Sequence, residues 1–403
     1  MKVLQINVTA NSGSHGRIAA GIGTQLILGG HQSYIAYGRT GYFCGSELIK
    51  IGGKTDLSLH LLKTRLLDRH CFGSKHSTAN FIKKITKIDP DVIHLHNLHG
   101  YYLNISVLFK YLKDSGKPVI WTFHDTWPIT GHCSFFEHIH CYKWKTECSA
   151  CPNIHGYPKS WFIDNSRRNY REKKALFTSL EKLVLVSPSE WLAGHLRQSF
   201  LSPYEIRVIN NGVEISKFSP DSNGLVNQKY SLTKKYILGV ANIWDERKGL
   251  KDFVRLREIL DNNIDIVLVG LSSDQIKSLG NGMKGIRRTE SIGDLASLYA
   301  GAEIFVNPTY LDNFPLVNIE ALSCGTPVIT YRTGGSHESI DEESGRMVEQ
   351  GDVKALHDSI MEIISLKNST TSRKCRDRAV DKFSAEARYN DYISLYQESL
   401  KMK

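Results

Sequence analysis

Short apolar segments alternate with amphipathic stretches along the first half of the chain. The segments expected to be strands are Val3–Val8, Ser33–Tyr37, Val92–His96, Val119–Phe123, Leu183–Ser187 and Arg207–Asn210. The stretches expected to be helices are Ile18–Leu28, Asn80–Ile88, Ile105–Lys113, Arg171–Leu180 and Trp191–Ser199. This alternation is typical of βαβ units in a parallel, doubly wound sheet. Residues 40–78 follow it poorly, and there we expect an irregular excursion with one helix.

The same alternation begins again near residue 236. Strands are expected at Tyr236–Val240, Ile264–Gly270, Gly285–Arg288, Ile304–Asn307, Val328–Tyr331 and Arg346–Glu349, and helices at Leu250–Leu260, Ser273–Leu279, Gly293–Ala300, Pro315–Ser323 and Val353–Ile364. A stretch rich in Pro, Asn, Ser and Gly, Ser219–Asn227, is the expected linker. Ser384–Lys403 is a long helical pattern that no strand follows. The chain is therefore predicted to hold two α/β domains, and a cleft between two such sheets is a usual place for a ligand.

The composition is that of a globular protein. The 403 residues, 41% of them hydrophobic, suffice for two or three domains. The sequence has no run of eighteen apolar residues, so we expect no membrane-spanning helix. The N-terminal segment Met1–Gly16 lacks the apolar core and the cleavage site of a signal peptide. We therefore expect a cytosolic protein.

Positive charge is concentrated in the first half of the chain. Residues 1–200 hold 25 Lys and Arg against 13 Asp and Glu, a net charge of +12, whereas residues 201–403 have a net charge of −2. A basic half beside a nearly neutral half suggests an anionic partner for the first half: lipid headgroups, a diphosphate-linked substrate or nucleic acid. The alternative is that these cations form ordinary solvated faces of helices.

The segment Asn307–Thr330, NPTYLDNFPLVNIEALSCGTPVIT, carries the strongest functional signal. Asp312 lies in a loop after one expected strand, and Glu320 lies eight residues later in a helix. Pro315 suits the first turn of that helix and Gly325 ends it. A loop of this kind opens at the carboxyl edge of a parallel sheet, where ligands usually bind.

The chemistry of this segment fits a nucleotide sugar. Asn313, Phe314 and Pro315 lead into a helix N-terminus, whose amide groups and dipole favour a phosphate. The carboxylates of Asp312 and Glu320 can accept hydrogen bonds from hydroxyl groups. Phosphate together with several hydroxyls describes a nucleotide sugar. The alternative is an N-cap aspartate and an exposed helix glutamate without a ligand.

Two segments of the first domain also follow expected strands and should lie at the carboxyl edge of its sheet. The loop Asn11–Arg17 holds Gly13 and Gly16, which would let a ligand approach the backbone closely. It does not match G-x-G-x-x-G, so a conventional dinucleotide site is not expected. His124, followed by Asp125, can act in acid–base chemistry or bind hydroxyls. The alternatives are a tight turn and a structural histidine.

Arg247 and Lys248 come just before an expected helix of the second domain. Two adjacent cations can neutralise a pyrophosphate, the arginine through two parallel hydrogen bonds and the lysine as a point charge. Adjacent cations are also common on solvated surfaces. Their place after the first strand of the domain favours the functional interpretation.

Four of the eight cysteines fall within one 19-residue window, and they are Cys133, Cys141, Cys148 and Cys151. In a cytosolic chain such clustering indicates a metal more often than a disulfide. The spacing Cys148-x-x-Cys151 is common in tetrahedral zinc sites, and a neighbouring histidine (His132, His138 or His140) could replace one of the four. A closed four-ligand zinc site would be structural. The alternative is a buried thiol cluster without metal.

Taken together, these residues resemble family 4 of the retaining glycosyltransferases. Asp312-x7-Glu320 followed by ALSCGTPVI looks like the E-x7-E signature of that family. Other segments occur in the family's order, namely the glycine loop Gly13–Gly16, FHD at Phe123–Asp125, VSPSEWLAGHL at Val186–Leu196, VINNGVE at Val208–Glu214, RKGL at Arg247–Leu250 and TGGSHESI at Thr333–Ile340. The resemblance covers nearly the whole chain. The pattern TGHC…C…WKTEC…CP is similar to a branch of capsule, O-antigen and exopolysaccharide enzymes.

The resemblance implies the GT-B fold, an α/β fold of two Rossmann-like, doubly wound parallel-sheet domains that face each other across a cleft. Residues 1–212, with a Cys-rich insertion at 131–153, would form the acceptor-side domain. Residues 213–383 would form the domain that binds the nucleotide-sugar donor. The C-terminal helix 384–403 would return to the first domain.

The resemblance also implies roles for the donor-side residues. Glu320 would hold the ribose hydroxyls of the donor nucleotide, and Asp312 would hold hydroxyls of the donor sugar. Arg247 and Lys248 would stabilise the departing pyrophosphate in place of a metal ion, so catalysis would need charge stabilisation more than a strong base.

The glycines and His124 would complete the site. Gly334 and Gly335 would shape the donor pocket, and the glycine loop of the first domain would approach the diphosphate or the acceptor. His124 would lie near the reacting sugar.

The sequence departs from the family pattern at two places. Asp312 stands where the family has glutamate, so its carboxylate reaches one methylene less far. The usual Gly-Arg before Lys-Gly reads Ala241-Asn242, which leaves Arg247 as the substitute. A metal-binding D-x-D motif is not evident, because Asp89-Pro90-Asp91 leads into a strand and so lies at the wrong edge of the sheet.

The resemblance implies a metal-independent glycosyltransferase of the hexosyltransferase type. It would move a sugar from a nucleotide-diphosphate sugar to a polysaccharide or a polyprenyl-linked oligosaccharide, in the biosynthesis of a cell-surface polysaccharide such as a capsule or an exopolysaccharide. The basic half would suit an anionic membrane surface, so the enzyme would be cytoplasmic or peripheral at the inner face of the cell membrane.

Other functions remain as alternatives. One is a GT-B-like sugar-nucleotide epimerase, and another is a non-catalytic nucleotide-binding relative. Nucleic-acid binding is not expected, because the cysteines do not match a DNA-reading finger and the cations are spread over many segments.

Overall fold

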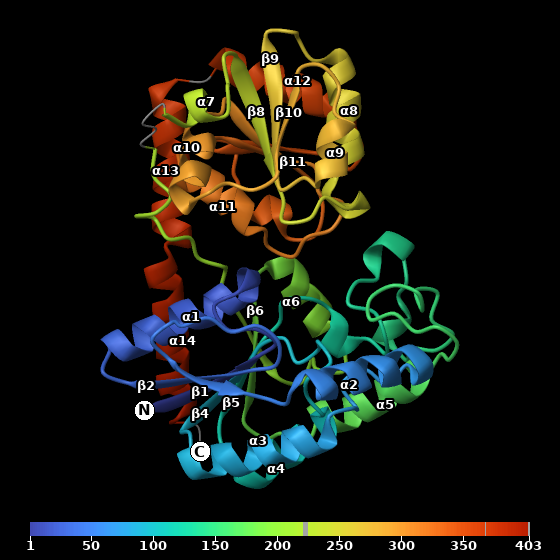
Figure 1. The fold of residues 1–403 in the computed structure, drawn as a ribbon. Helices are drawn as coiled ribbons and strands as arrows, with labels where there is room; N and C mark the ends of the chain where they lie inside the picture. The colour runs from blue at the N-terminus through green and yellow to red at the C-terminus, as the bar shows by residue number, and fades with distance from the viewer. Residues whose placement is uncertain (221–224, 367, 402–403) are drawn as a thin grey trace. The chain divides into compact units, whose positions relative to one another are not determined.

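The computed structural model describes residues 1–220, 225–366 and 368–401, which form two compact units (Figure 1). Unit 1 comprises Met1–Asn210 and the C-terminal residues from Arg388 onwards. Unit 2 comprises Asn211–Ala387. Each unit is a parallel sheet flanked by helices, which confirms the predicted fold class.

Unit 1 is built on a seven-stranded parallel sheet of order β3-β2-β1-β4-β5-β6-β7. Its strands are β1 (Lys2–Asn7), β2 (Gln32–Tyr37), β3 (Glu47–Lys50), β4 (Val92–Leu95), β5 (Val119–Thr122), β6 (Leu183–Ser187) and β7 (Glu205–Val208). Every residue of β4, β5 and β6 is buried, as expected for central strands covered on both faces. The helices before residue 200 are α1 (Gly13–Leu28), α2 (Lys54–Leu67), α3 (Lys75–Ile88), α4 (Ile105–Ser115), α5 (Ser166–Phe177) and α6 (Glu190–Arg197).

The expectation of an irregular excursion with one helix at residues 40–78 was confirmed for the helix and wrong for the strand. This region holds the edge strand β3, the helix α2 and the first turn of α3. The strand was missed because β3 has only one buried residue, Ile49. The helix pattern of α2 was obscured because its fully buried residues are polar, His60 and Thr64, while its leucines are exposed.

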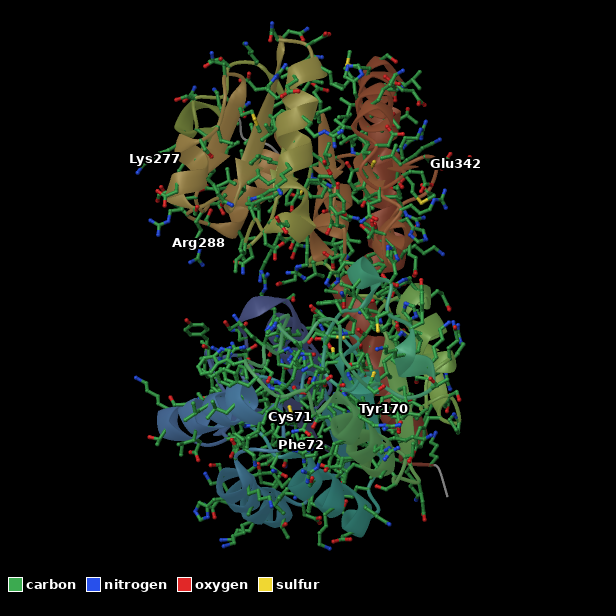
Figure 2. All side chains as sticks on the ribbon, turned by 90° about the vertical axis from the view of Figure 1, so that its right-hand side faces the viewer. Cys71, Phe72, Tyr170, Lys277, Arg288 and Glu342 are labelled. Carbon is green, nitrogen blue, oxygen red and sulfur yellow. The ribbon has the colours of Figure 1, made fainter. Side chains whose placement is uncertain are left out.

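The Cys-rich insertion 131–153 is a loop region that carries two short 3-10 helices, η2 (Glu137–Ile139) and η3 (Lys143–Lys145), and it follows a third, η1 (Trp127–Ile129). It is held to unit 1 by aromatic packing, since Phe136 and Trp144 stack at 4.9 Å and both are buried. Tyr170 of α5, marked in Figure 2, donates a hydrogen bond to the Trp144 carbonyl oxygen at 2.9 Å. Phe136 and Trp144 also lie 5.3 Å from the ring of His195 on α6, so they extend the hydrophobic core of unit 1 into the insertion.

Unit 2 is built on a six-stranded parallel sheet of order β10-β9-β8-β11-β12-β13. Its strands are β8 (Lys235–Val240), β9 (Ile264–Val269), β10 (Met283–Ile286), β11 (Ile304–Asn307), β12 (Val328–Tyr331) and β13 (Gly345–Val348). Alternate residues of these strands enter two separate hydrophobic clusters, for example Leu238 in one and Ile237 in the other. Because side chains alternate across a strand, the two clusters are the two covered faces of the sheet.

The helices of unit 2 connect these strands and cover both faces. They are α7 (Leu225–Lys229), η4 (Glu246–Lys248), α8 (Leu250–Ile259), α9 (Ser273–Lys277), α10 (Ile292–Gly301), α11 (Leu316–Ser323), η5 (Ser336–Ser339), α12 (Val353–Leu366) and α13 (Ser369–Phe383). The sequence did not predict α13. Its buried residues Cys375, Ala379 and Phe383 form a stripe only one residue wide in an otherwise polar helix.

The predicted linker Ser219–Asn227 lies inside unit 2. Residues 221–224 lie outside the described residues, and residues 225–227 belong to α7. The two units meet in sequence at Asn210–Asn211 instead.

The final helix, α14 (Ala385–Ser399), carries residues of unit 1 at its C-terminal end. Tyr396 bonds through its hydroxyl to His94 Nδ1 at 2.6 Å, and the Thr122 hydroxyl donates to Tyr392 at 3.3 Å. These contacts anchor α14 on the central strands β4 and β5. Among the described residues, no helix is both long and apolar enough to cross a bilayer.

Candidate active site

Three loops of unit 2 meet at the carboxyl edge of its sheet, after β8, β11 and β12. The contact between the loops after β11 and β12 is so close that any side chain on Gly334 would collide with the carbonyl oxygen of Asp312. Gly334 also has a φ of +51°, which favours glycine. In the same way, Gly249 at the end of the β8 loop leaves no room for a side chain beside Pro308. The sequence therefore requires glycine at these two positions to bring the predicted donor residues together.

Lys248 and Asp312 form an ion pair across two of these loops. Lys248 Nζ lies 2.6 Å from Asp312 Oδ2, and the two side chains are 25% and 22% exposed. The other carboxylate oxygen, Oδ1, accepts a hydrogen bond from the Asn313 amide at 3.0 Å. The structure thus joins a residue predicted to bind pyrophosphate to one predicted to bind the sugar.

Arg247 is held by a residue that the sequence did not single out. Its guanidinium donates to Asp245 Oδ2 at 2.8 and 3.1 Å, and the Arg247 carbonyl oxygen accepts from the Tyr310 amide at 2.7 Å. Asp245 also caps η4 by accepting from the Arg247 amide. The signal for it was only the sequence Asp245-Glu246-Arg247-Lys248, in which two acids directly precede two bases, so the sequence does not indicate which residues pair.

Glu320 lies on α11 and is buried, with 8% of the residue exposed. Its carboxylate accepts a hydrogen bond from the Tyr299 hydroxyl at 3.1 Å. The alternative drawn from the sequence fits neither Glu320 nor Asp312. Glu320 is not an exposed helix glutamate. Asp312 is not the N-cap, because that position is occupied by Pro315.

The remaining predicted donor-side residues have mixed surroundings. Asn313 and Phe314 are both buried. The Phe314 ring packs against Phe383, with ring centroids 5.5 Å apart, and its carbonyl oxygen accepts from Asn211 Nδ2 at 3.0 Å. Gly335 begins η5 as its N-cap. Phe314 is therefore also a packing residue of unit 2.

In unit 1, His124 follows β5 and ends a chain of hydrogen bonds. Its Nε2 lies 3.1 Å from His96 Nδ1, and His96 Nε2 lies 3.0 Å from Gln5 Oε1. Gln5 donates from Nε2 to the Ala19 carbonyl oxygen, so its Oε1 must accept from His96 Nε2–H. His96 Nδ1 then accepts from His124 Nε2–H, which leaves Nδ1 of a neutral His124 as an acceptor.

The electrostatics agree with neutral imidazoles in this chain. Burial, followed by the charges of His96 and His15, holds the pKa of His124 well below its ordinary value. Burial and the neighbouring His94 and His15 do the same for the pKa of His96.

The glycine loop of unit 1 brings His15 to this chain. The loop runs directly into α1, which begins at Gly13, where φ is +68°. Gly16 leaves no room for a side chain beside the Thr9 hydroxyl. His15 Nδ1 accepts from Asn7 Nδ2 at 3.1 Å, and the His15 and His124 rings are 5.7 Å apart. Burial, then the charge of His99, lowers the pKa of His15 to about 4.

A second polar group of unit 1 was missed by sequence reasoning. His99 Nε2 lies 2.7 Å from Asp125 Oδ2, and His99 Nδ1 lies 3.1 Å from the Tyr157 hydroxyl. Burial raises the pKa of Asp125, but His99 and the Trp127 amide lower it further, so the net pKa is below the ordinary value. The available signal was the run HLHNLHG after β4, in which His94, His96 and His99 all follow or end a strand.

The four clustered cysteines are free thiols, and the structure does not support a zinc site as they stand. Cys133 donates a hydrogen bond to Cys151, which raises the pKa of Cys133 and lowers that of Cys151. Within the described ranges, no three His, Cys, Asp or Glu side chains gather closely enough to hold a metal ion. His132 pairs through Nδ1 with Asp68 Oδ1 at 2.5 Å.

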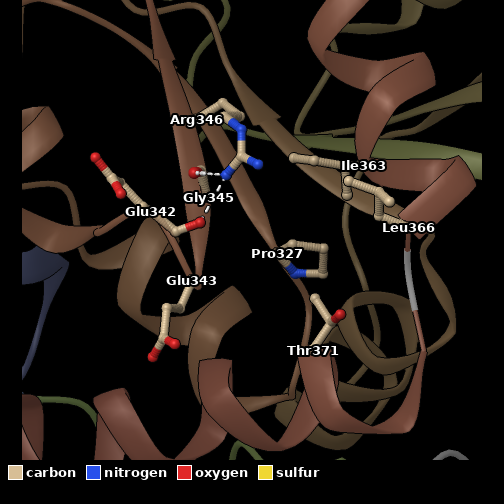
Figure 3. Close-up of a pocket in the computed structure, with 8 residues that line it drawn as sticks. All are labelled: Pro327, Glu342, Glu343, Gly345, Arg346, Ile363, Leu366 and Thr371. Carbon is tan, nitrogen blue, oxygen red and sulfur yellow. Dashed lines mark hydrogen bonds between the residues drawn. The ribbon is translucent and has the colours of Figure 1, made fainter.

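A pocket of about 160 Å³ in unit 2 contains none of the predicted site residues (Figure 3). It is lined by Pro327, Glu342, Glu343, Gly345, Arg346, Ile363, Leu366 and Thr371. Pro327 and Gly345 stand at the starts of β12 and β13, so the pocket lies at the amino edge of the sheet, opposite the Lys248–Asp312 pair. Glu342 is on the surface there (Figure 2).

Comparison with known proteins identifies the class of protein. Residues 59–217 match the family model described as Glycosyltransferase Family 4, and residues 234–365 match that described as Glycosyl transferases group 1. Among solved structures, sucrose-phosphate synthase from Thermosynechococcus elongatus superposes with a TM-score of 0.72 at 19% identity, over 99% of this chain and 98% of that one. Anabaena HepE in complex with UDP gives 0.70 at 16% identity, over 99% and 100%. The fold is therefore the GT-B fold.

Among curated relatives, WcaC of Escherichia coli K12, whose name describes a colanic acid biosynthesis glycosyl transferase, is 27% identical over 98% of this chain and 100% of its own length. CapM of Staphylococcus aureus, a capsular polysaccharide biosynthesis glycosyltransferase, is 27% identical over 48% of this chain and 54% of its own. With both of its units matched, the chain belongs to the family 4 (group 1) glycosyltransferases. It is a glycosyltransferase.

Proposed function

We propose that the chain is a retaining glycosyltransferase that moves a sugar from a nucleotide-diphosphate sugar to a polysaccharide or lipid-linked oligosaccharide acceptor of the cell surface. The observation that carries the proposal is the edge of unit 2, where three loops bring Arg247 and Lys248 next to Asp312. Cations beside a carboxylate suit a ligand that has both a diphosphate and hydroxyls. The relatives named for colanic acid and capsule synthesis support the class of acceptor.

Unit 2 would bind the donor. Glu320 would accept hydrogen bonds from the ribose hydroxyls, and Asp312 would do so from the sugar hydroxyls. Lys248 and Arg247 would hold the pyrophosphate, where fixed positive charge stabilises the leaving group without a metal ion. The amides that precede α11, at Asn313, Phe314 and Pro315, and the loop at Gly334 and Gly335 would line the pocket. HepE, which has the same fold, was solved with UDP and UDP-glucose, and this supports a nucleotide-diphosphate donor.

Unit 1 would bind the acceptor. His124 would lie at the reacting sugar with its Nδ1 available to accept a hydrogen bond from a hydroxyl. The loop at Gly13 and Gly16 opens α1, so its amides would meet the diphosphate of the donor or of a lipid-linked acceptor. One relative, 25% identical over half of this chain, is a galactosyltransferase named for a diphosphoundecaprenol acceptor, which supports an acceptor of that chemistry.

A lipid-linked acceptor would be presented at a membrane. The net charge of +12 in residues 1–200 supports attraction to anionic lipid headgroups. We therefore propose a cytoplasmic enzyme that associates peripherally with the inner face of the membrane, without a nucleic-acid partner.

Structural zinc at Cys133, Cys141, Cys148 and Cys151 stays a prediction of the sequence. The electrostatic interactions of Cys133 with Cys151, Cys148 and Cys141 support the proximity of the four thiols. Metal analysis of the purified protein decides the matter: one zinc per chain would support the site, and none would remove it.

The donor is tested by thermal unfolding with UDP, GDP, ADP and CMP in the presence of EDTA. A ligand at 100 times its Kd should stabilise the native state by about 2.7 kcal/mol. We expect one nucleoside diphosphate to raise the unfolding temperature and EDTA not to prevent it. No shift with any of them in a folded sample would contradict the proposal.

Transfer itself is tested with the nucleotide sugar that the first experiment selects. We expect release of nucleoside diphosphate to depend on an added polyprenyl-diphosphate oligosaccharide or polysaccharide fragment. Conversion of the nucleotide sugar without acceptor would indicate an epimerase instead.

A further inference from the structure

The helix α2 of unit 1 has its apolar side toward solvent. Its innermost residues are polar, because His60 accepts from the Cys71 amide at 3.0 Å and the Thr64 hydroxyl donates to the His60 carbonyl oxygen. Leu59, Leu62 and Leu66, one to two turns apart on the opposite side, are 62%, 47% and 37% exposed. An ordinary surface helix buries its apolar stripe and exposes its polar one. The leucine face, Leu59–Leu62–Leu66, is therefore an exposed apolar surface that local folding does not explain.

A second exposed apolar segment, Trp161–Phe162–Ile163, lies against the end of the same helix. The Trp161 amide donates to the Arg65 carbonyl oxygen at 2.8 Å, and Arg65 Nη1 donates to the Lys159 carbonyl oxygen at 2.8 Å. Phe162 is 79% exposed, and its ring lies 6.3 Å from that of Trp161. Together the leucine face and Trp161–Ile163 form one surface of six large apolar side chains, drawn from two segments that hydrogen bonds hold together. α2 lies on the outside of unit 1 (Figure 1).

Positive charge surrounds this surface. Lys54 and Lys159 are exposed, and Arg65 stands between the two apolar groups. Burial, and then the charges of Arg69, Lys75 and Arg168, lower the pKa of Lys63, whereas the charge of Glu172 raises it. Glu172 pairs with Arg69 and Arg168, which leaves Lys63 and Lys75 as the remaining cations of this group. The acids of the helix and its C-cap are engaged internally, since Asp56 accepts from the Gly53 amide and Asp68 pairs with buried His132. The surface is thus apolar with a basic border.

We propose that the leucine face and Trp161–Ile163 form a surface that docks unit 1 on an anionic lipid bilayer. Leucine and aromatic side chains with adjacent Lys and Arg are the composition of elements that lie in the membrane interface. A protein partner would need acidic groups arranged against these cations, whereas a bilayer supplies negative charge at any orientation. This inference rests on the proposed function in one respect, because a lipid-linked acceptor would lie in the membrane that unit 1 is proposed to bind.

The inner side of α2 links this surface to the polar groups of unit 1. His60 contacts the rings of His70 and Tyr101, and His70 lies 5.9 Å from the ring of Tyr157, the partner of His99. The packing of these buried rings therefore connects the inner side of α2 to the histidines of unit 1.

The test is co-sedimentation of the full chain with vesicles of phosphatidylglycerol and phosphatidylcholine in equal parts, and with phosphatidylcholine alone. We expect binding to the anionic vesicles only, weakened in 1 M NaCl because the charges are then screened. The variant Leu62→Gln/Leu66→Gln/Phe162→Ser should bind at least tenfold more weakly. A matched control, Leu28→Gln/Val254→Ser/Ile259→Gln, changes three equally exposed apolar residues elsewhere and should stay within twofold of the wild type.

Three results would overturn the proposal. The first is the absence of wild-type binding to anionic vesicles, and the second is equal binding by the two triple variants. The third is a wild-type dimer in sedimentation velocity that the docking variant dissolves while vesicle binding is unchanged, which would make the surface a contact between copies. Stabilisation of the docking variant by the nucleoside diphosphate that binds the wild type should equal that of the wild type. If no nucleotide stabilises the wild type but the vesicles bind it, the proposed function fails and the docking surface stands.

Discussion

Lys248 and Asp312 neutralise each other across two loops of unit 2, with 2.6 Å between Nζ and Oδ2. Ion pairs with this degree of exposure contribute only about 0–1 kcal/mol to stability. The pair is therefore easily exchanged for other partners. In the proposed reaction, the pyrophosphate binds Lys248 and the sugar hydroxyls bind Asp312. Donor binding therefore replaces one ion pair with two substrate contacts.

Removal of the cation tests this exchange most directly. Lys248→Ala should lower kcat/KM by about 10²–10³-fold, the usual effect of removing one charge-stabilising group from the reacting centre. The unfolding temperature should hardly change. The control Lys251→Ala removes a highly exposed cation that lies three residues after Lys248 and pairs with Glu246. Equal activity of the two variants in initial-rate assays would exclude Lys248 from the site.

The second test changes the length of the carboxylate side chain at position 312. Asp312→Glu restores the family's usual residue and should preserve or raise the transfer rate, because the carboxylate then reaches one methylene farther. Asp312→Ala should abolish transfer and leaves Lys248 without its partner. Rates should be measured at saturating donor with each variant. Full activity of the alanine variant would remove Asp312 from the list of substrate contacts.

Gly334 tests whether the approach of the two loops matters for the donor. Gly334→Ala places a methyl group against the Asp312 carbonyl oxygen in a left-handed conformation, so it should displace the Asp312 loop. We expect the apparent affinity for the nucleoside diphosphate selected by thermal unfolding to fall at least tenfold. Gly280→Ala is the matched control, because a side chain there meets open space. An unchanged affinity in Gly334→Ala would show that donor binding does not depend on this contact.

The sequence predicted the parts of the site that lie within one segment better than the contacts between segments. Asp312, Glu320 and the helix between them could be placed because Pro315 and Gly325 mark the two ends of α11. The pairing of Lys248 with Asp312 joins residues 64 positions apart. It depends on Gly249 and Gly334, where a side chain would collide with the neighbouring loop. Such contacts leave no local periodicity in the sequence.

The strand β3 and the helix α13 were missed, and the bounds of α2 could not be placed, for a related reason. Periodicity arguments assume that apolar residues face inward, and α2 buries His60 and Thr64 instead. The hydrogen bonds that link Gln5, His96 and His124 could likewise not be predicted. Gln5 is a fully buried polar residue of β1, at a position where the pattern predicts an apolar core. The departures from the ordinary pattern thus coincide with the candidate acceptor side and the docking surface.

His124 is expected to act on catalysis and not on donor binding. His124→Asn should lower kcat by about 10²-fold or more, the effect of losing a positioned acid–base or hydroxyl-binding group. The rise in unfolding temperature caused by the selected nucleoside diphosphate should remain, because the donor residues belong to unit 2. The control His76→Asn changes an exposed histidine of α3 that bonds only to Asn80 among the described contacts. A parallel loss of kcat and of nucleotide affinity would contradict the assignment to the acceptor side.

The buried histidines of unit 1 should make it sensitive to acid. Burial, followed by the charge of Lys63, lowers the pKa of His60 to about 3 from its ordinary 6.5. Between these two values the unfolded chain binds a proton that the folded chain does not, so the free energy of unfolding must decrease as the pH falls from 6.5 towards 3. One pKa unit corresponds to about 1.36 kcal/mol, so by pH 5 His60 alone should cost on the order of 2 kcal/mol.

Urea unfolding at pH 7.5 and pH 5 measures this contribution. His60→Asn cannot take up the proton, so its loss of stability between the two pH values should be smaller than that of the wild type by about 2 kcal/mol. His76→Asn is the control, and because His76 is exposed in the folded chain it should keep the full wild-type loss. The comparison concerns the change with pH and not the stability at one pH, so a structural cost of either substitution cancels. An equal loss in His60→Asn and the wild type would mean that His60 is protonated in the folded chain at pH 5, and its hydrogen bond from the Cys71 amide could then not persist there.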